Sequence, residues 1–193
     1  MITKARISVL VAAFFISLFS LSAVSEAAQT MKNALDDKQR AMVAISALSG
    51  AGELPKLETA LSQGLDAGLT GNEVKEILVQ VYAYAGFPRS LNAITVFKTV
   101  LNGRKAKGVN YPEGKAPSPL PADRTSLEFG TENQTRLVGQ PVGGGIYEFV
   151  PAIDQFLKAH LFGDIFQRDN LDWEHPELAT IGILAAIPGV NPQ

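Results

Sequence analysis

The feature that most constrains the fold of this chain is a Gly-Phe-Pro corner at residues 86–88, where two helical patterns meet. Gly86 can end the first helix, and Pro88 can begin the second, because the missing proline N–H has no intrahelical partner in a first turn. Before the corner, apolar side chains recur at helical steps, at Val74, Ile77, Leu78, Val81 and Ala85. After it, the step resumes at Leu91, Ile94, Thr95 and Lys98, with Phe97 and Leu101 extending the apolar side.

A polar stripe runs along the helix that precedes the corner. Thr70 is a good N-cap for that helix, and Glu73 three residues later completes a capping box. Glu76, Gln80 and Tyr84 follow four residues apart, so they share one side of the helix. Two interpretations stay open: a solvated edge, or the lip of a pocket that faces a ligand. In the second interpretation Glu76 acts as an acid or base, and Tyr84 donates to an oxyanion.

Two further helices are predicted upstream of the stripe. Residues 35–51 carry Asp36 and Asp37 at their start, where carboxylates suit the helix dipole, and glycines at their end. Residues 54–67 form the next helix, with Pro55 tolerable in its first turn. Together with the two helices of the corner, they indicate an all-α stack of helical hairpins.

The N-terminus has the pattern of a signal peptide. Lys4 and Arg6 precede an apolar run at residues 7–21, and small residues up to Ala27 suit cleavage after that position. A transmembrane anchor is the alternative, but the run is short for a bilayer span and no second span follows. We therefore expect residues 1–27 to be removed and the protein to be periplasmic or secreted, with no stable membrane anchor.

The composition narrows the range of chemistry. The chain has no cysteine, which excludes a disulfide framework, a thiol nucleophile and a cysteine metal site. His160 and His175 are too few and too scattered to predict a metal site. The formal net charge is only -2 and no basic run appears, so we expect no nucleic acid partner.

Residues 103–145 interrupt the helical patterns. Prolines cluster there, at Pro112, Pro117, Pro119 and Pro121, and three glycines follow at 143–145. This composition predicts an extended, largely irregular connector, which is long for a single domain and is either mobile or packed across another subunit. The glycines lack the lysine and the preceding strand of a phosphate-binding loop, so a flexible loop is the favoured interpretation.

Residues 146–193 contain a partial second copy of the first helix. Residues 171–172 and 177–186 line up with residues 35–36 and 41–50 at a constant offset, with mostly apolar or small side chains in both. The chain ends before the copy reaches counterparts of the later helices. The second-copy helix must therefore dock on the first copy or on another chain.

The segment before this copy is predicted to be an amphipathic helix. Its apolar residues are expected in the core, namely Phe156, Leu157, Leu161, Ile165 and Phe166. Its polar residues His160, Asp164 and Arg168 either face solvent or line a site.

The run from Gln80 to Ala93, which contains the corner, resembles the signature helix pair of the carboxymuconolactone decarboxylase family. That family also contains the AhpD-type alkylhydroperoxidases. The resemblance implies an AhpD-like helical fold, with a first repeat at residues 28–102. In this family a Phe-Gly-Asp and a following Arg help to build the pocket. By that likeness His160, Asp164 and Arg168 are candidates here.

The resemblance also shows where this chain departs from the family. The reactive Cys-x-x-Cys and His positions fall at Glu53, Lys56 and Ala60 in the first copy, so thiol peroxidase chemistry is excluded. In the second copy they fall at Gly189, at Pro192 and beyond the end. The Arg that usually precedes a family Glu is Arg40 in the first copy and Pro176 in the second, although Glu177 keeps the Glu. Pro176 is also expected to cost one helix hydrogen bond.

Three hypotheses of function follow. The first is a cofactor-free lyase that removes carbon dioxide from a small lactone acid, with an arginine holding the carboxylate and an acid or phenol moving the proton. The second is a non-catalytic protein that binds a small acid, and the third is a chain with an assembly role alone. The candidate residues are Glu76, Tyr84 and His160 for catalysis, and Gln80, Arg89, Asp164 and Arg168 for substrate binding.

The resemblance further implies a homo-oligomer, a trimer or hexamer. Small side chains at Ala41, Ala44 and Ala47 would allow helices to approach closely.

Overall fold

The helices of the structure follow the predicted order. A computed structural model describes residues 35–119, 122–172 and 174–190, and within them there are seven α-helices, one π-helix and no β-strand. The all-α prediction is therefore confirmed for the AhpD-like fold. From Asp37 onward, the described residues make one compact unit. The predicted signal peptide lies outside the described residues. None of the described helices combines the length and the apolar character needed to cross a membrane.

The first three described helices begin and end close to the predicted positions. Helix α2 spans Asp37–Ala51, and α3 spans Leu54–Asp66 with a proline in its first turn. Helix α4 spans Gly71–Ala106, and the capping box of Thr70 and Glu73 is present at its start.

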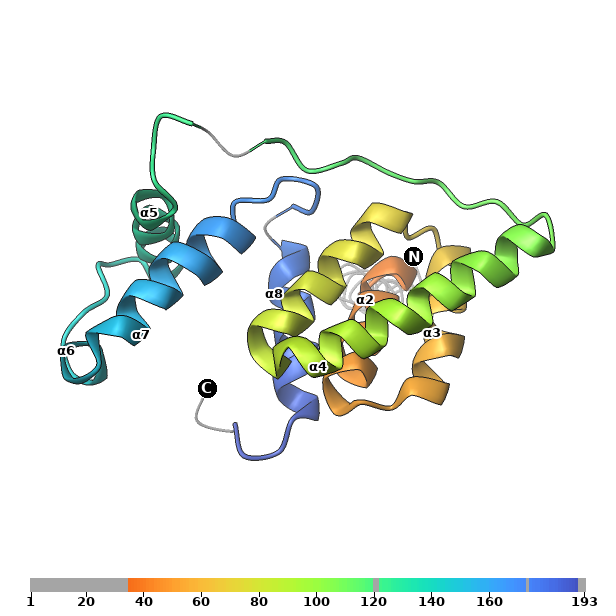
Figure 1. Ribbon diagram of the computed structural model, residues 1–193, viewed down its shortest axis with the longest axis horizontal. Coiled ribbons are helices and arrows are strands. Elements are labelled where there is room, and N and C mark those ends of the chain that lie inside the picture. The colour runs from red at the N-terminus through yellow and green to blue at the C-terminus, as the bar shows by residue number, and fades with distance from the viewer. Residues whose placement is uncertain (1–34, 120–121, 173, 191–193) are drawn as a thin grey trace, which may run out of the picture. The chain divides into compact units, whose positions relative to one another are not determined.

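Helix α4 bends at the Gly-Phe-Pro corner. Gly86 has φ 78° and ψ 165°, a backbone conformation that only glycine adopts readily. Near the bend, the buried Ser90 hydroxyl donates to the Leu78 carbonyl at 2.8 Å, which links the residues after the bend to those before it. Figure 1 shows the two limbs of α4 meeting at this bend.

The hydrophobic core lies among α2, α3, α4 and the last helix, α8 (Glu174–Ala186). Its fully buried apolar side chains include Met42, Ile45, Leu57, Leu61, Ile77 and Ile183. Helix α8 thus docks on the first copy in the same chain, one of the two options that the partial repeat left open. Pro176 is the third residue of α8, where N–H groups lack intrahelical partners, so the expected loss of a helix bond was wrong.

Helices α2 and α8 approach closely because their contacting side chains are small. A Cβ added to Gly182 would collide with the Ser46 side chain, and one added to Gly50 would lie 3.1 Å from Ile183 Cγ2. Ser46 and Gly182 occupy the same place in the two aligned segments. Serine and glycine therefore make a close helix contact within one chain, and the close contact of alanines between subunits stays a prediction.

The prediction of a largely irregular connector at 103–145 is wrong at two places. Helix α4 continues to Ala106, and residues 126–138 form α5 (Ser126–Val138), which begins with its own capping box at Thr125 and Glu128. Residues 109–119, which lie between them, have no regular secondary structure and are hydrogen-bonded to the start of α4 and to Asp169. Gly71 N–H donates to the Pro112 carbonyl at 2.9 Å.

A second set of contacts, to Asp169, holds residues 115–118 of this stretch. The Asp169 carboxylate accepts from Lys115 Nζ at 2.6 Å, and from the Ser118 N–H at 2.7 Å and hydroxyl at 2.8 Å. These contacts, with Lys115 the strongest, hold the pKa of Asp169 well below its usual value.

Three consecutive helical segments follow α5: α6 (Ile146–Phe149), α7 (Pro151–Phe156) and the π-helix η1 (Leu157–Ile165). Helix η1 packs against α5 so closely that a Cβ on Gly130 would collide with the Lys158 carbonyl, and one on Gly163 with the Ser126 carbonyl. Ile165 and Phe166 are buried as predicted, but Phe156 is 64% exposed, which corrects its assignment to the core.

Candidate functional site

A buried ion pair joins the polar stripe of α4 to the segment after η1. The Glu76 side chain is only 6% exposed, and both of its oxygens accept from the Arg168 guanidinium. Arg168 Nη2 lies 3.2 Å from Glu76 Oε2, and Nε donates to Oε1. Such a two-point contact fixes the orientation of both planar groups. The interpretation of this part of the stripe as a solvated edge is therefore wrong.

Gln80 lies one helical turn beyond Glu76 on the same side of α4. It is 2% exposed, and its Oε1 atom is buried without a hydrogen-bond partner among the described residues. A buried carbonyl oxygen of this kind is costly unless something donates to it. A ligand hydroxyl or protonated carboxyl could supply the missing donor.

The third residue of the stripe, Tyr84, faces α8. It makes a hydrogen bond with the Thr180 side chain, and Glu177 lies near enough to act on its charge. Burial raises the pKa of the Tyr84 phenol, the negative charge of Glu177 raises it further, and the Thr180 bond offsets part of the rise. Burial also raises the pKa of the Glu177 carboxyl. Both groups are thus shifted toward their neutral, proton-donating forms.

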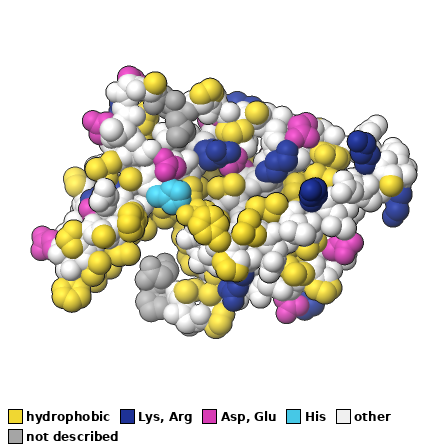
Figure 2. Space-filling model, viewed as in Figure 1, with side chains coloured by type: hydrophobic (Ala, Val, Ile, Leu, Met, Phe, Trp, Pro, Cys, Tyr) yellow, Lys and Arg dark blue, Asp and Glu magenta, His cyan; other side chains and the backbone are white. Residues whose placement is uncertain are grey.

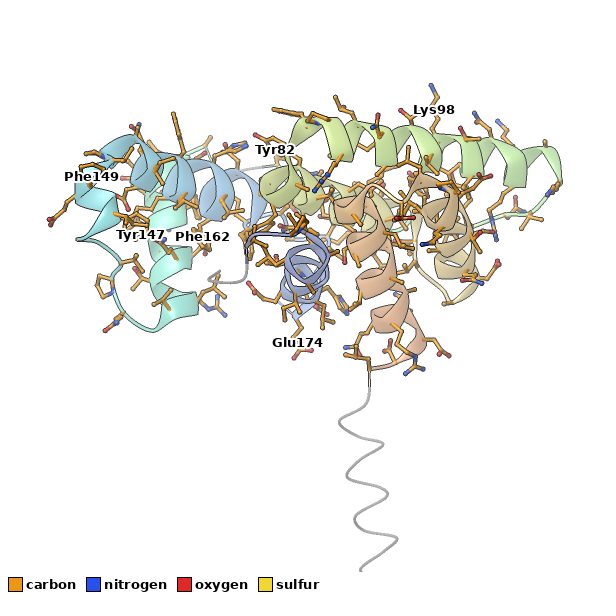
Figure 3. All side chains as sticks on the ribbon, turned by 90° about the horizontal axis from the view of Figure 1, so that it is seen from below. Tyr82, Lys98, Tyr147, Phe149, Phe162 and Glu174 are labelled. Carbon is orange, nitrogen blue, oxygen red and sulfur yellow. The ribbon has the colours of Figure 1, made fainter. Side chains whose placement is uncertain are left out.

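His160 and Asp164 form a separate cluster on η1. His160 Nδ1 lies 2.9 Å from Asp164 Oδ2, and His160 Nε2 lies 2.8 Å from the Tyr82 hydroxyl of α4. The Ser126 hydroxyl of α5 donates to the other oxygen of Asp164. In Figure 3 Tyr82 lies at the end of the first limb of α4, beside the ribbon of η1.

The helix geometry explains why the candidates divide into two groups. Residues two apart on an α-helix point to nearly opposite sides, so Tyr82 faces η1 while Tyr84 faces α8. The structure thus pairs Glu76 with Arg168 and His160 with Asp164, in two separate contacts.

Arg89, the remaining candidate, joins neither group. It is partly exposed just after the bend, and no hydrogen bond or ion pair links its side chain to another residue of the described part.

The sequence analysis did not name four of the residues in these contacts as site residues. They are Tyr82, Ser126, Glu177 and Thr180. Tyr82 and Glu177 stood in motifs already noted, so pairing α4 with η1 and α8 would have found them. Ser126 stood in the segment expected to be irregular, although the capping box beside it was a usable signal.

Two hollows border these groups. One, of about 380 Å³, is lined by Arg168 and by polar side chains including Asn133 and Gln167. Gln167 Oε1 is buried there without a partner among the described residues. The other, of about 260 Å³, is lined by Tyr82 and His160. Across the described ranges, no group of three histidine or acidic side chains is arranged to hold a metal ion.

At the positions where the family carries its reactive cysteines and histidine, this chain has side chains with structural roles. Glu53 precedes α3 and pairs with Lys56 at 3.1 Å, and Ala60 is buried in the core. The chain therefore fills these positions with a surface ion pair and a packing residue.

Comparison with known proteins agrees with the resemblance drawn from the corner. The model of the carboxymuconolactone decarboxylase family matches residues 20–99. No curated protein sequence matches the chain significantly. The matched segment contains α2, α3, the polar stripe and the Gly-Phe-Pro bend. Over residues 20–99 the protein is similar to the carboxymuconolactone decarboxylase family, although it has no cysteine.

Proposed function

We propose that this protein is a cofactor-free lyase that removes carbon dioxide from a small lactone or carboxylic acid. The observation that carries the proposal is the meeting of Tyr84 and Glu177 at the end of the polar stripe, where both groups are held toward their protonated forms. Acids with raised pKa values that meet in a partly buried place are typical of proton-transfer sites.

The stripe offers the parts that such a reaction needs. Arg168 stands at one end as a carboxylate-binding group, and Gln80 in the middle has an unused acceptor. Tyr84 is eight positions after Glu76, roughly 12 Å along the helix, so a ligand that reached both ends would lie across Gln80.

The proposed step requires a proton but no redox partner. Loss of carbon dioxide breaks a carbon–carbon bond and leaves its electron pair on the conjugated lactone. A proton must then reach a ring carbon, and Glu177 or Tyr84 would supply it. The substrate carboxylate has no proton to give, so the acid that protonated the ring carbon takes up a proton from solvent, which restores the site.

A specific observation favours a second candidate, a non-catalytic protein that binds small acids. Glu76 already neutralises the Arg168 guanidinium through two contacts. An arginine so occupied binds a further carboxylate less strongly than a free one does.

The test measures carbon dioxide release and the loss of lactone absorbance, with 4-carboxymuconolactone and simpler γ-lactone acids as substrates. We expect turnover by the full chain and a loss of at least about 100-fold in Glu177→Gln, since a general acid contributes roughly 10²–10⁴-fold. Glu174→Gln is the matched control, because Glu174 is an exposed carboxylate in the first turn of the same helix. Calorimetric binding without turnover would favour the second candidate, and neither binding nor turnover would refute both.

We also propose that the protein is exported and forms a homo-oligomer. Large apolar side chains are exposed on α6 and directly after it, and Figure 2 shows apolar side chains gathered over this part of the molecule. They are Ile146, Phe149 and Val150, which are 41% to 86% exposed. Apolar surface on this scale favours contact with another protein surface.

A further inference from the structure

We propose that Tyr82, His160, Asp164 and Ser126 form a second site, which hydrolyses small, uncharged, activated esters with the Tyr82 phenol oxygen as nucleophile. The proposal stands apart from the lyase site, because it uses the side of α4 that faces η1.

The hydrogen bonds of this cluster follow the order of a nucleophile–base–orienter array. An ionised Asp164 only accepts, so His160 Nδ1 carries the proton of the 2.9 Å contact. In the tautomer assigned in this way, Nε2 is the acceptor for the Tyr82 hydroxyl, which lies 2.8 Å away. Both distances fall within the range at which a base can activate a hydroxyl nucleophile, and tyrosine is among the side chains that form covalent intermediates.

The surrounding shell holds this array in place. Ser126 donates to Asp164 from the first residue of α5, and α5 is seated on η1 by the two glycine contacts at Gly130 and Gly163. The segment that carries His160 and Asp164 is a π-helix, closed by a Phe166 N–H to Leu161 carbonyl bond of 3.0 Å. Short π-helical segments occur frequently at functional sites.

The hollow beside the array sets the class of ligand. It measures about 260 Å³, and Tyr82 and His160 are the polar side chains of its lining. The other lining residues are apolar: Ala83, Ile153, Phe156, Leu157, Leu161 and Ile165. The described lining holds no lysine or arginine, so an apolar acyl group suits it better than a carboxylate. The lining also has no further side-chain donor for an oxyanion, so we expect esters with good leaving groups to react and alkyl esters to react slowly.

The reaction balances without a cofactor. The Tyr82 oxygen attacks the ester carbonyl carbon while its proton passes to His160 Nε2. The bond to the alcohol oxygen then breaks, and His160 returns the proton to that leaving group. Water, deprotonated by His160, attacks the tyrosyl ester, releases the acid and restores the phenol.

Covalent labelling tests the nucleophile directly. The probe is diethyl p-nitrophenyl phosphate, which would place a diethylphosphoryl group on Tyr82 and release p-nitrophenolate. The chain has four tyrosines, at 82, 84, 111 and 147, and peptide mass spectrometry distinguishes them. We expect label on Tyr82, with the same residue required for hydrolysis of p-nitrophenyl acetate. Equal labelling of Tyr111 or Tyr147 would overturn the proposal.

Matched variants separate the array from general tyrosine reactivity. Tyr82→Phe should abolish labelling, His160→Gln should slow it by at least about 100-fold, and Tyr147→Phe should leave it unchanged. Ser126→Ala should slow labelling several-fold at an unchanged melting temperature, and Ser126→Thr should restore it. Retained ester hydrolysis in Tyr82→Phe refutes the assignment. Glu177→Gln, which tests the lyase, should leave the labelling of Tyr82 intact, so the two proposals can fail independently.

Discussion

The Arg168 guanidinium holds the buried Glu76 carboxylate through two contacts, across 92 residues of chain. Arg168→Met would leave that carboxylate buried and unpaired. We expect a loss of about 2 kcal/mol in the free energy of unfolding, less than for a fully buried pair because the Arg168 side chain is 34% exposed. Urea unfolding measures it. The double variant Glu76→Gln/Arg168→Met should lose less than Arg168→Met alone, and an equal or larger loss would show that the charge is not the cause.

The bend in α4 depends on one glycine. Gly86→Ala places a side chain at φ 78°, and we expect a destabilisation of about 1–3 kcal/mol. Gly103→Ala is the control in the same helix, since an added Cβ there meets nothing within 4 Å and its backbone is helical. That change should stabilise the protein by about 0.5–1 kcal/mol. Thermal unfolding of both variants tests the contrast, which would fail if Gly86→Ala were neutral.

The packing of α5 on η1 leaves no space for a methyl group at Gly130. An added Cβ would collide with the Lys158 carbonyl, which is backbone and cannot rotate away. We expect Gly130→Ala to cost roughly 2–3 kcal/mol or more, as overpacking does. Gly143→Ala, where an added Cβ meets nothing within 4 Å, should be nearly neutral. Hydrogen exchange of the α5 amides would reveal the same difference locally, and unchanged protection in Gly130→Ala would contradict the tight contact.

The partial burial of Glu177 makes stability depend on pH. Because the folded-state pKa of Glu177 is raised, the folded chain holds this proton to higher pH than the unfolded chain does. Stability from this group is therefore present below the unfolded pKa and is lost as pH rises through the folded pKa. We expect Glu177→Gln to raise the melting temperature at pH 7, by less than about 4 °C for a chain of this size.

The higher melting temperature of Glu177→Gln should disappear below about pH 4, where the Glu177 carboxyl is protonated in both the folded and the unfolded state. Calorimetric scans of Glu177→Gln and Glu174→Gln at several pH values provide the check. A pH-independent difference between wild type and Glu177→Gln would refute the linkage to ionisation.

The exposed apolar side chains of α6 provide a test of self-association. Phe149 is 86% exposed and Ile146 is 69% exposed. If another copy covers them, Phe149→Ser should weaken association more than tenfold, because burying a large apolar side chain contributes roughly 1.5–3 kcal/mol. Light-scattering mass as a function of concentration measures the change. Ile181→Ser, at an apolar residue of α8 that is 61% exposed, serves as the comparison. An unchanged mass in Phe149→Ser would show that α6 is not part of the interface.

Local signals predicted the first half of the fold well. The capping box of Thr70 and Glu73 and the corner at Gly86 act over a few residues, so their effect can be read without knowing the tertiary structure. Helix α5 was missed because the prolines before it dominated the composition of the segment, although Thr125 and Glu128 repeat the same capping pattern.

The division of the candidate residues into two groups could not be predicted from local sequence signals. The sequence places Glu76, Gln80 and Tyr84 on one side of a helix, but it does not say which later segment packs there. Tyr82 became a site residue only when η1 brought His160 to its side of α4, a contact between residues 78 apart. Long-range packing of this kind has no local pattern.

The crossing of α2 and α8 brings together Ser46 and Gly182, two residues at the same place in the two aligned segments. A contact between equivalent positions is what a two-fold homodimer has on its symmetry axis. This polypeptide therefore carries, between two parts of itself, the kind of self-complementary pairing that two identical chains make. The two residues occupy one small space between the helices. Position 46 can hold a serine because position 182 has no side chain, so a larger residue at one position requires a smaller one at the other.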